Sequence, residues 1–393
     1  MNQEANKSNE SDHLSFYRAH GISPVRQDIS NLRAHFTRRE TLYRQLGILP
    51  GFISGKRVLE VGPGSGFNAL YTASLEPESL LLVEPNPTGA ADIRRLIGDY
   101  PELEDRVETL ELDLFDFQSE GGFDFVFCEG LLAGTPEPEK VLGRLAGLVA
   151  KGGVLVVTSE DYISKLAETL RRLFADLVSD ATAPLDDQVN CLLPVFSSHL
   201  ATLSGMSRNH EDWIIDNLIN PASIGRLLSL PDTISVLSDE FDFFASSPHI
   251  VTDWRWYKSV FSEEKKDYNA RTTEQYWSLA HNFIDYRITA PGRSREANRT
   301  LYHLCKGIRD TTRLYEQQRD PSRIDEARNL LSKLVEHVRA APRDFTAELT
   351  GALEEARSFV LQDTIDGAAI ANSRYFSSWF GRGQQYISFS NRL

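Results

Sequence analysis

The chain has 393 residues, which is longer than one average domain and predicts two modules or one enlarged domain with insertions. Hydrophobic residues make up 41% and charged residues 25%, a composition that excludes a disordered or fibrous protein. The 42 Lys and Arg against 56 Asp and Glu give a net charge of -14, which disfavours nucleic acid as a partner.

The first part of the chain is predicted to contain a tail and one helix. Residues 1–20 are expected to be a disordered tail, since their start is polar and rich in Asn, Ser and Glu, and order is expected from about Pro24. Apolar residues between 24 and 48 recur with roughly helical spacing, and the pattern ends at Gly47 and Pro50. A helix is therefore expected before the first strand.

The next hundred residues alternate short aliphatic runs with longer segments. Five strands are predicted at 57–61, 80–83, 107–110, 123–127 and 154–157. The intervening segments are long enough for crossover helices, so a parallel sheet covered on both faces is expected. The predicted fold class is α/β, a Rossmann-like doubly wound sheet.

The pattern changes beyond Thr158. Residues 161–230 are predicted to be mostly helical, 233–237 and 241–244 are possible strands, and 250–261 is a weaker one. Helical patterning then dominates to about residue 371. The acidity is uneven as well, because residues 1–262 carry a net charge of -16 and the remainder +2.

The most informative segment is a strand that runs into a glycine-rich loop and then a helix. Glycines stand at every second position, Gly62, Gly64 and Gly66, which lets the backbone turn sharply beside a ligand. The spacing G-x-G-x-G lacks the third glycine of nicotinamide-binding loops. Glu60 precedes the loop and Glu84 ends the second strand; they suit an ammonium or sulfonium and a ribose, respectively.

These segments resemble the ordered motifs of class I S-adenosylmethionine-dependent methyltransferases. The resemblance covers about residues 56–160 and rests on the set of motifs, namely Glu60–Gly66, Glu84, Leu112–Leu114, Phe123–Glu129 and Lys151–Val156. It implies S-adenosyl-L-methionine as the cofactor, and it implies an enzyme.

The resemblance also implies a role for each motif. The loop residues Gly62, Pro63, Gly64, Ser65 and Gly66 would hold the methionine portion, next to Glu60. Glu84, followed by Pro85, would bind the ribose hydroxyls, Asp113 the adenine amino group and the Leu114 backbone the ring, while Cys128 would lie near the transferred methyl. The alternatives are a turn with a solvated acid at Glu84 and an N-cap at Asp113.

The methyl-acceptor site is less visible. Candidate catalytic residues are Glu129, which follows the fourth strand, and the pair His210 and Asp212, which could form an oriented base. The competing interpretation makes 209–213 a helix-capping cluster. Likewise, the aromatic segment 375–386 is either a lid over the acceptor or a segment docked on the helical domain.

The sequence thus predicts four parts: a tail (1–20), a cofactor-binding domain (21–160 and 231–262), a helical insertion that caps the substrate (161–230) and a helical carboxy-terminal domain (263–393). The expected reaction is methyl transfer to O or N of a small metabolite. Alternatives are a protein or peptide N-methyltransferase of the arginine type and a non-catalytic interaction module.

Partners and compartment follow from composition. Three isolated cysteines form neither a disulfide framework nor a thiolate zinc site, and no residue spacing predicts a metal. The start of the chain is polar and the longest apolar runs are short, so a cytoplasmic protein without membrane or nucleic-acid partners is expected. The oligomeric state is left open.

Overall fold

The computed structural model describes residues 12–260, 267–361 and 365–393, and the chain divides into two compact units. Unit 1 comprises Met1–Ser159, Arg226–Gln275 and Gln384–Leu393, and unit 2 comprises Glu160–Gly225 and Tyr276–Gly383. The segments predicted as a helical insertion and as a helical carboxy-terminal domain therefore fall largely together in unit 2.

Unit 1 is built on a seven-stranded sheet in the order β3-β2-β1-β4-β5-β7-β6. Its strands are β1 (Arg57–Val61), β2 (Ser79–Val83), β3 (Val107–Leu110), β4 (Phe123–Cys128), β5 (Val149–Ser159), β6 (Phe241–Ser247) and β7 (Gln385–Asn391). The first five are parallel, whereas β7 runs antiparallel to both β5 and β6. The predicted α/β fold with a mostly parallel sheet is confirmed.

The helices of unit 1 are α1 (Asp12–His20), α2 (Leu32–Gln45), α3 (Pro50–Ile53), α4 (Ala69–Ser74), α5 (Pro87–Gly98), α6 (Pro138–Ala146) and α10 (Leu230–Leu237), with short 3-10 turns at Pro101–Leu103, Leu132–Gly134 and Tyr257–Ser259. Helix α11 (Tyr268–Leu279) continues past the end of the unit 1 segment. The expected crossover helix between β3 and β4 is absent, because the residues from 111 to 122 form turns and loop.

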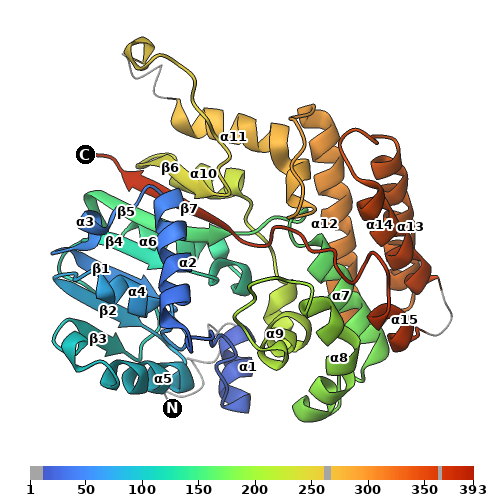
Figure 1. The fold of residues 1–393 in the computed structure, drawn as a ribbon, viewed down its shortest axis with the longest axis horizontal. Coiled ribbons are helices and arrows are strands. Elements are labelled where there is room, and N and C mark those ends of the chain that lie inside the picture. Colours follow the sequence, from blue (N-terminus) through green and yellow to red (C-terminus); the bar gives the residue numbers. More distant parts are fainter. Residues whose placement is uncertain (1–11, 261–266, 362–364) are drawn as a thin grey trace, which may run out of the picture. The chain divides into compact units, whose positions relative to one another are not determined.

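Unit 2 is helical. It contains α7 (Leu166–Val178), α8 (Leu185–Leu200), α9 (His210–Ile214), α12 (Arg295–Gln318), α13 (Ser322–Arg339), α14 (Ala347–Val360) and α15 (Gly367–Ala371), with a π-helical turn at Ile215–Ile219 and 3-10 turns at Pro221–Ile224 and Ala280–Phe283. Helices α12, α13 and α14 lie side by side (Figure 1). No helix in the described ranges offers an apolar stretch long enough to span a bilayer.

Three further sequence expectations are wrong. The tail is shorter than predicted: residues 1–11 lie outside the described residues, but Asp12–His20 form α1. The possible strand at 233–237 is helix α10, because Ser229 and Asp232 make a reciprocal capping box around Pro231. Of the weak strand at 250–261, Tyr257–Ser259 form a 3-10 turn and residue 261 lies outside the described residues.

The most consequential difference is at the carboxy terminus. The last residues of the predicted helical domain form β7, which inserts between β5 and β6 (red in Figure 1). Its apolar side chains Ile387 and Phe389 alternate with serines and are fully buried, the period-two pattern of a strand. The end of the chain therefore belongs to the sheet that carries the glycine loop.

The core beneath α2 and α4 fixes the first strands. Tyr43, Leu46, Leu70, Phe125 and Phe127 belong to one buried cluster in which α2, α4 and β4 meet. Parallel strands buried on both faces carry nearly continuous apolar runs, as β2 and β4 do here. A polar residue buried within such a strand needs a hydrogen-bond or ionic partner. Glu60 in β1 is the clearest example.

Candidate functional site

The carboxyl ends of β1 and β4 meet at the point where the strand order reverses. Val61 at the end of β1 is in register with Cys128 at the end of β4. Neighbouring β1 and β4 lead their chains toward opposite edges of the sheet, and in open α/β sheets ligands bind in the crevice at such a point. The glycine loop and Glu129 therefore extend from adjacent strand ends.

The glycine loop needs its glycines. Gly62, Gly64 and Gly66 have φ angles of 69°, 60° and 78°, a left-handed region that other residues rarely adopt. A Cβ on Gly64 would lie 2.3 Å from Cγ2 of Val25, whereas a Cβ on Gly62 would meet only Leu131, at 4.0 Å. The loop is thus tightly covered at Gly64 and open at Gly62.

Glu84 holds the glycine loop to the end of β2. Its Oε2 accepts a hydrogen bond from the Gly64 N–H and its Oε1 from the Asn86 N–H, both at 2.8 Å. Burial raises the pKa of Glu84 to about 7, although these two hydrogen bonds counteract the rise. The carboxylate is therefore fixed beside the loop, where the resemblance places the ribose.

Glu60 is a buried carboxyl group that lacks a full set of partners. It is 2% exposed in the middle of the sheet, and its Oε2 has no hydrogen-bond partner among the described residues. Burial raises its pKa to about 8, and the nearby Arg39 only partly opposes this rise. An unpartnered buried carboxylate is costly, so a cationic ligand group beside the loop would supply what this residue lacks. The site therefore fits a cofactor that carries an ammonium.

A polar cluster lies at the end of β4. Arg39 of α2 donates through Nη1 to Oε2 of Glu129 at 2.9 Å, and the hydroxyl of Tyr386 in β7 donates to Oε1 of Glu129. The Arg39 guanidinium lies 5.3 Å from the ring centre of Phe127 and 5.6 Å from that of Tyr43. Burial alone would lower the pKa of Arg39, but Glu129, with smaller contributions from Tyr43, Tyr386 and Glu60, keeps the pKa above its usual value.

Two members of this cluster were missed by sequence reasoning. Arg39 belongs to a buried stripe of α2 with His35 and Tyr43, spaced by four residues, which is one face of a helix. His35 donates through Nε2 to the Phe67 carbonyl, 3.0 Å away, directly after the glycine loop. A polar stripe on the buried face of α2 was the available signal for Arg39. Tyr386 ends the aromatic segment 375–386, for which a lid over the acceptor was one interpretation, but its place in β7 was not predicted.

The segment from α1 to residue 30, here called the N-terminal strap, contacts the glycine loop and its surroundings. The hydroxyl of Ser65 lies 3.0 Å from that of Ser23, and the Asn86 side chain donates to the Ile22 carbonyl at 2.9 Å. Arg26 donates through Nε and Nη2 to Asp92 of α5, at 3.1 and 2.9 Å. The strap thus covers the loop from outside the sheet.

The remaining cofactor candidates are placed less tightly. Asp113 is exposed and its Oδ1 accepts from the Phe115 N–H at 2.8 Å, so it opens a turn, while Leu114 is buried beside it. Cys128 is buried, and burial raises the pKa of its thiol, with Glu60 and Glu129 adding to the effect. The carbonyl of Pro85 accepts a hydrogen bond from Arg18 of the strap.

His210 and Asp212 occupy a helix start in unit 2. Asn209 is the N-cap of α9, its Oδ1 accepts from the Asp212 N–H at 2.6 Å, and its Nδ2 donates to the Asp212 carboxylate at 3.1 Å. These are the contacts of the capping interpretation. The structure thus gives Asp212 a local structural partner.

The aromatic segment before β7 docks within unit 2. Phe376 and Trp379 are fully buried, and the Trp379 indole donates to the Ile284 carbonyl at 2.7 Å. The guanidinium of the buried Arg171 lies 3.7 Å from the ring centre of Phe380. The docking interpretation of residues 375–386 therefore holds for residues 375–383, whereas Gln385 and Tyr386 belong to β7 of unit 1 and Tyr386 bonds to Glu129.

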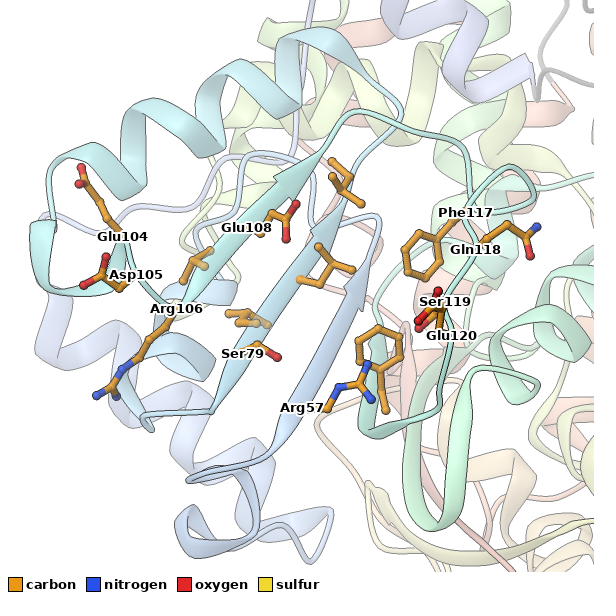
Figure 2. Close-up of a pocket in the computed structure, with 15 residues that line it drawn as sticks. Arg57, Ser79, Glu104, Asp105, Arg106, Glu108, Phe117, Gln118, Ser119 and Glu120 are labelled. Carbon is orange, nitrogen blue, oxygen red and sulfur yellow. The ribbon is translucent and has the colours of Figure 1, made fainter.

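A separate pocket lies on the sheet face beside β3. It has a volume of about 640 Å³ and is lined by residues of β1, β2 and β3 (Figure 2). The connection from β3 to β4 forms no helix, so it does not cover this face of the sheet. Arg57 and Ser79, at the amino ends of β1 and β2, contribute to its lining. Ligands of such sheets bind at the carboxyl ends, so this pocket is distinct from the glycine-loop site.

Comparison with known proteins matches the region that contains the glycine loop. Residues 59–155 match the family model described as a methyltransferase domain. The uncharacterized protein syc1184_c of Synechococcus is 26% identical over 41% of this chain and 39% of its own length. A tRNA U34 carboxymethyltransferase of Methylococcus capsulatus is 32% identical over 27% of this chain and 32% of that enzyme. The chain therefore spans less than half the length of these relatives.

Among solved structures, PKMT2 from Rickettsia typhi in complex with AdoHcy superposes with a TM-score of 0.44 and 16% identity, covering 62% of this chain and 50% of that one. The family match begins within β1 and ends within β5, so it contains the glycine loop, Glu84 and Glu129. Residues 59–155 therefore form a methyltransferase domain.

Proposed function

We propose that this chain transfers a methyl group from S-adenosyl-L-methionine to an oxygen or nitrogen of a small-molecule metabolite. The observation that carries the proposal is Glu60, a buried carboxyl group with an unpartnered oxygen directly before a glycine loop. The cofactor supplies a methyl group activated by a sulfonium. The chain's own residues then have to bind, orient and shield the reactants.

Each candidate residue has a place in this proposal. Gly62, Pro63, Gly64, Ser65 and Gly66 would cradle the methionine portion while Glu60 pairs with its ammonium. Glu84, already fixed by the Gly64 N–H, has lone pairs left for the ribose hydroxyls. Asp113 and Leu114 would meet the adenine. Cys128, at the end of β4, and Glu129, which follows it, would lie near the methyl.

The acceptor class follows from charge more than from shape. Unit 1 includes most of the acidic first 262 residues, which favours a neutral or cationic acceptor over an anionic one. Glu129 is the proposed acceptor-side carboxylate, and His210 and Asp212 are weaker candidates because capping accounts for their contacts.

Two other functions stay open to test. A protein or peptide N-methyltransferase of the arginine type would also use an acidic site, but the chain lacks a second glutamate in the expected loop. A non-catalytic interaction module would retain the fold without the cofactor. The unpartnered Glu60 oxygen argues against it, because a relic site has no reason to keep a costly buried carboxyl group.

Calorimetric titration with S-adenosylmethionine tests the proposal. Binding at micromolar concentration is expected for the full chain, and the absence of binding at high micromolar concentration would refute the methyltransferase hypothesis. E84A should weaken binding about tenfold or more, since hydrogen bonds to a charged group are worth about 1.5–3 kcal/mol. E108Q is the matched control, because Glu108 is an exposed residue of β3.

A further inference from the structure

Glu129 is held by groups from two distant parts of the chain. Its Oε2 accepts from Arg39 of α2, and its Oε1 from Tyr386 of β7, which lies 257 residues further along the chain. The backbone is fixed as well, since the Gly130 N–H donates to Oγ1 of Thr158 at 2.7 Å. A side chain with both oxygens held has little freedom to turn away from the end of β4.

The surroundings show that this arrangement is built rather than incidental. The side chain of Arg39 is 7% exposed, so a salt bridge with Glu129 forms where water screens it weakly. The side chain of Glu129 is 19% exposed, which leaves part of the carboxylate accessible. Each carboxylate oxygen has two lone pairs, so Glu129 can accept a further hydrogen bond while Arg39 and Tyr386 stay in place.

The sheet register places Glu129 beside the glycine loop. Cys128 pairs with Val61, so Glu129 follows at the level of the first loop glycine, Gly62. Gly62 is also the loop glycine with open space around it. The accessible edge of Glu129 and the open side of the loop thus belong to neighbouring strand ends.

We propose that Glu129 accepts a hydrogen bond from the methyl acceptor beside the transferred methyl, and that Arg39 and Tyr386 are positioning residues that hold it there. The proposal rests on the function proposed above and deepens it. It makes the acceptor a hydrogen-bond donor, a hydroxyl or an amine. A carboxylate acceptor is disfavoured, because it would meet the Glu129 carboxylate as a like charge.

Two cofactor analogues test this without knowledge of the acceptor. S-Adenosylhomocysteine has nothing in place of the methyl, whereas sinefungin carries a protonated amine there. If Glu129 faces that position, the wild-type chain binds sinefungin about tenfold or more tightly than S-adenosylhomocysteine, as a charge-assisted hydrogen bond predicts. Calorimetry on the full chain gives both affinities.

Variants assign the effect to residues. E129Q should bring the affinity ratio of the two analogues close to one while S-adenosylhomocysteine binding changes less than about twofold. Y386F should lower the ratio about threefold or more, because Glu129 loses one of the two groups that orient it. Y276F is the matched control: its hydroxyl is also buried, but it donates to Oδ2 of Asp161 in unit 2 at 3.0 Å, and its ratio should stay at the wild-type value.

Each contrary result has a distinct meaning. An unchanged ratio in E129Q, or an equal loss of both ligands, overturns the proposal while leaving the proposed function standing. A Y386F ratio equal to that of Y276F removes the positioning role of Tyr386. If the wild-type chain binds neither analogue, the proposed function fails and this inference fails with it.

Discussion

Replacing Glu60 with glutamine should change how the stability of the ligand-free protein depends on pH. Burial raises the pKa of Glu60 to about 8 from its ordinary value of 4.5. The folded chain therefore holds a proton on this group that the unfolded chain has released, so the stability present below pH 4.5 is lost as the pH rises toward 8. E60Q keeps the shape of the protonated group and cannot ionise.

The magnitude follows from linkage. With pKa values of 4.5 and about 8, ionisation of Glu60 costs the folded state up to about 4 kcal/mol at pH 8, of which about 2 kcal/mol accrues between pH 6 and pH 8. Between pH 6 and pH 8, the unfolding free energy of E60Q should therefore rise relative to that of the wild type by about 2 kcal/mol. Glu84 and Asp161, whose pKa values burial raises to about 7 and about 6, act equally in both proteins.

Urea unfolding at pH 6, 7 and 8 measures the gap in unfolding free energy between E60Q and wild type, with E108Q as an exposed control. Ligand adds a second readout, because S-adenosylmethionine should bind more tightly as Glu60 ionises, and E60Q should lose most of that rise. If the gap between E60Q and wild type changes by less than about 0.5 kcal/mol from pH 6 to pH 8, Glu60 is already ionised and paired without ligand. The argument that its unpartnered oxygen awaits a cation would then be refuted.

Three further changes have defined outcomes. R26A should loosen the strap and so speed S-adenosylmethionine dissociation several-fold in stopped-flow measurements. R95A removes the other cation bound to Asp92 and should leave the dissociation rate unchanged. Equal dissociation rates in the two variants would show that the strap does not retain the cofactor. G64A should abolish cofactor binding, since its φ of 60° and the 2.3 Å approach of Val25 forbid a Cβ; calorimetry showing wild-type affinity would contradict this. W379A should lower the unfolding free energy by about 3–5 kcal/mol in urea denaturation, because Trp379 is fully buried; a loss below about 1 kcal/mol would mean that its site collapses freely.

The sequence allowed the first half of the sheet to be predicted because each parallel strand there is a short apolar run between polar segments. β1, β3 and β4 lie within one residue of their expected bounds. β5 was expected four residues long and has eleven, since its first residues are polar or small and lack the apolar signature. β7 was missed because it is separated from its neighbour β6 by more than a hundred residues of helical unit 2.

The candidate site divides in the same way. Gly62, Glu60 and Glu84 are local features of strand ends, and the strand-loop-helix pattern points to them without a structure. Arg39 and Tyr386 matter only through the partner that they share, and no spacing in the sequence announces that partnership. His210 and Asp212 show the opposite error, in which a dense polar cluster has a local capping role.

The path of the chain gives a physical reason for this division. The cofactor half of the site is formed by residues that follow β1 and β2 directly, so a single continuous segment suffices for it. The proposed acceptor half joins α2, the end of β4 and β7, and it is complete only after the last residues have added their strand between β5 and β6. Closing so long a loop brings an entropy cost that the buried side chains of β7 must offset, and Ile387 and Phe389 are fully buried. The same burial that anchors the terminus sets the register that brings Tyr386 to Glu129. Changes in β7 packing should therefore affect the Glu129 cluster before they affect the glycine loop.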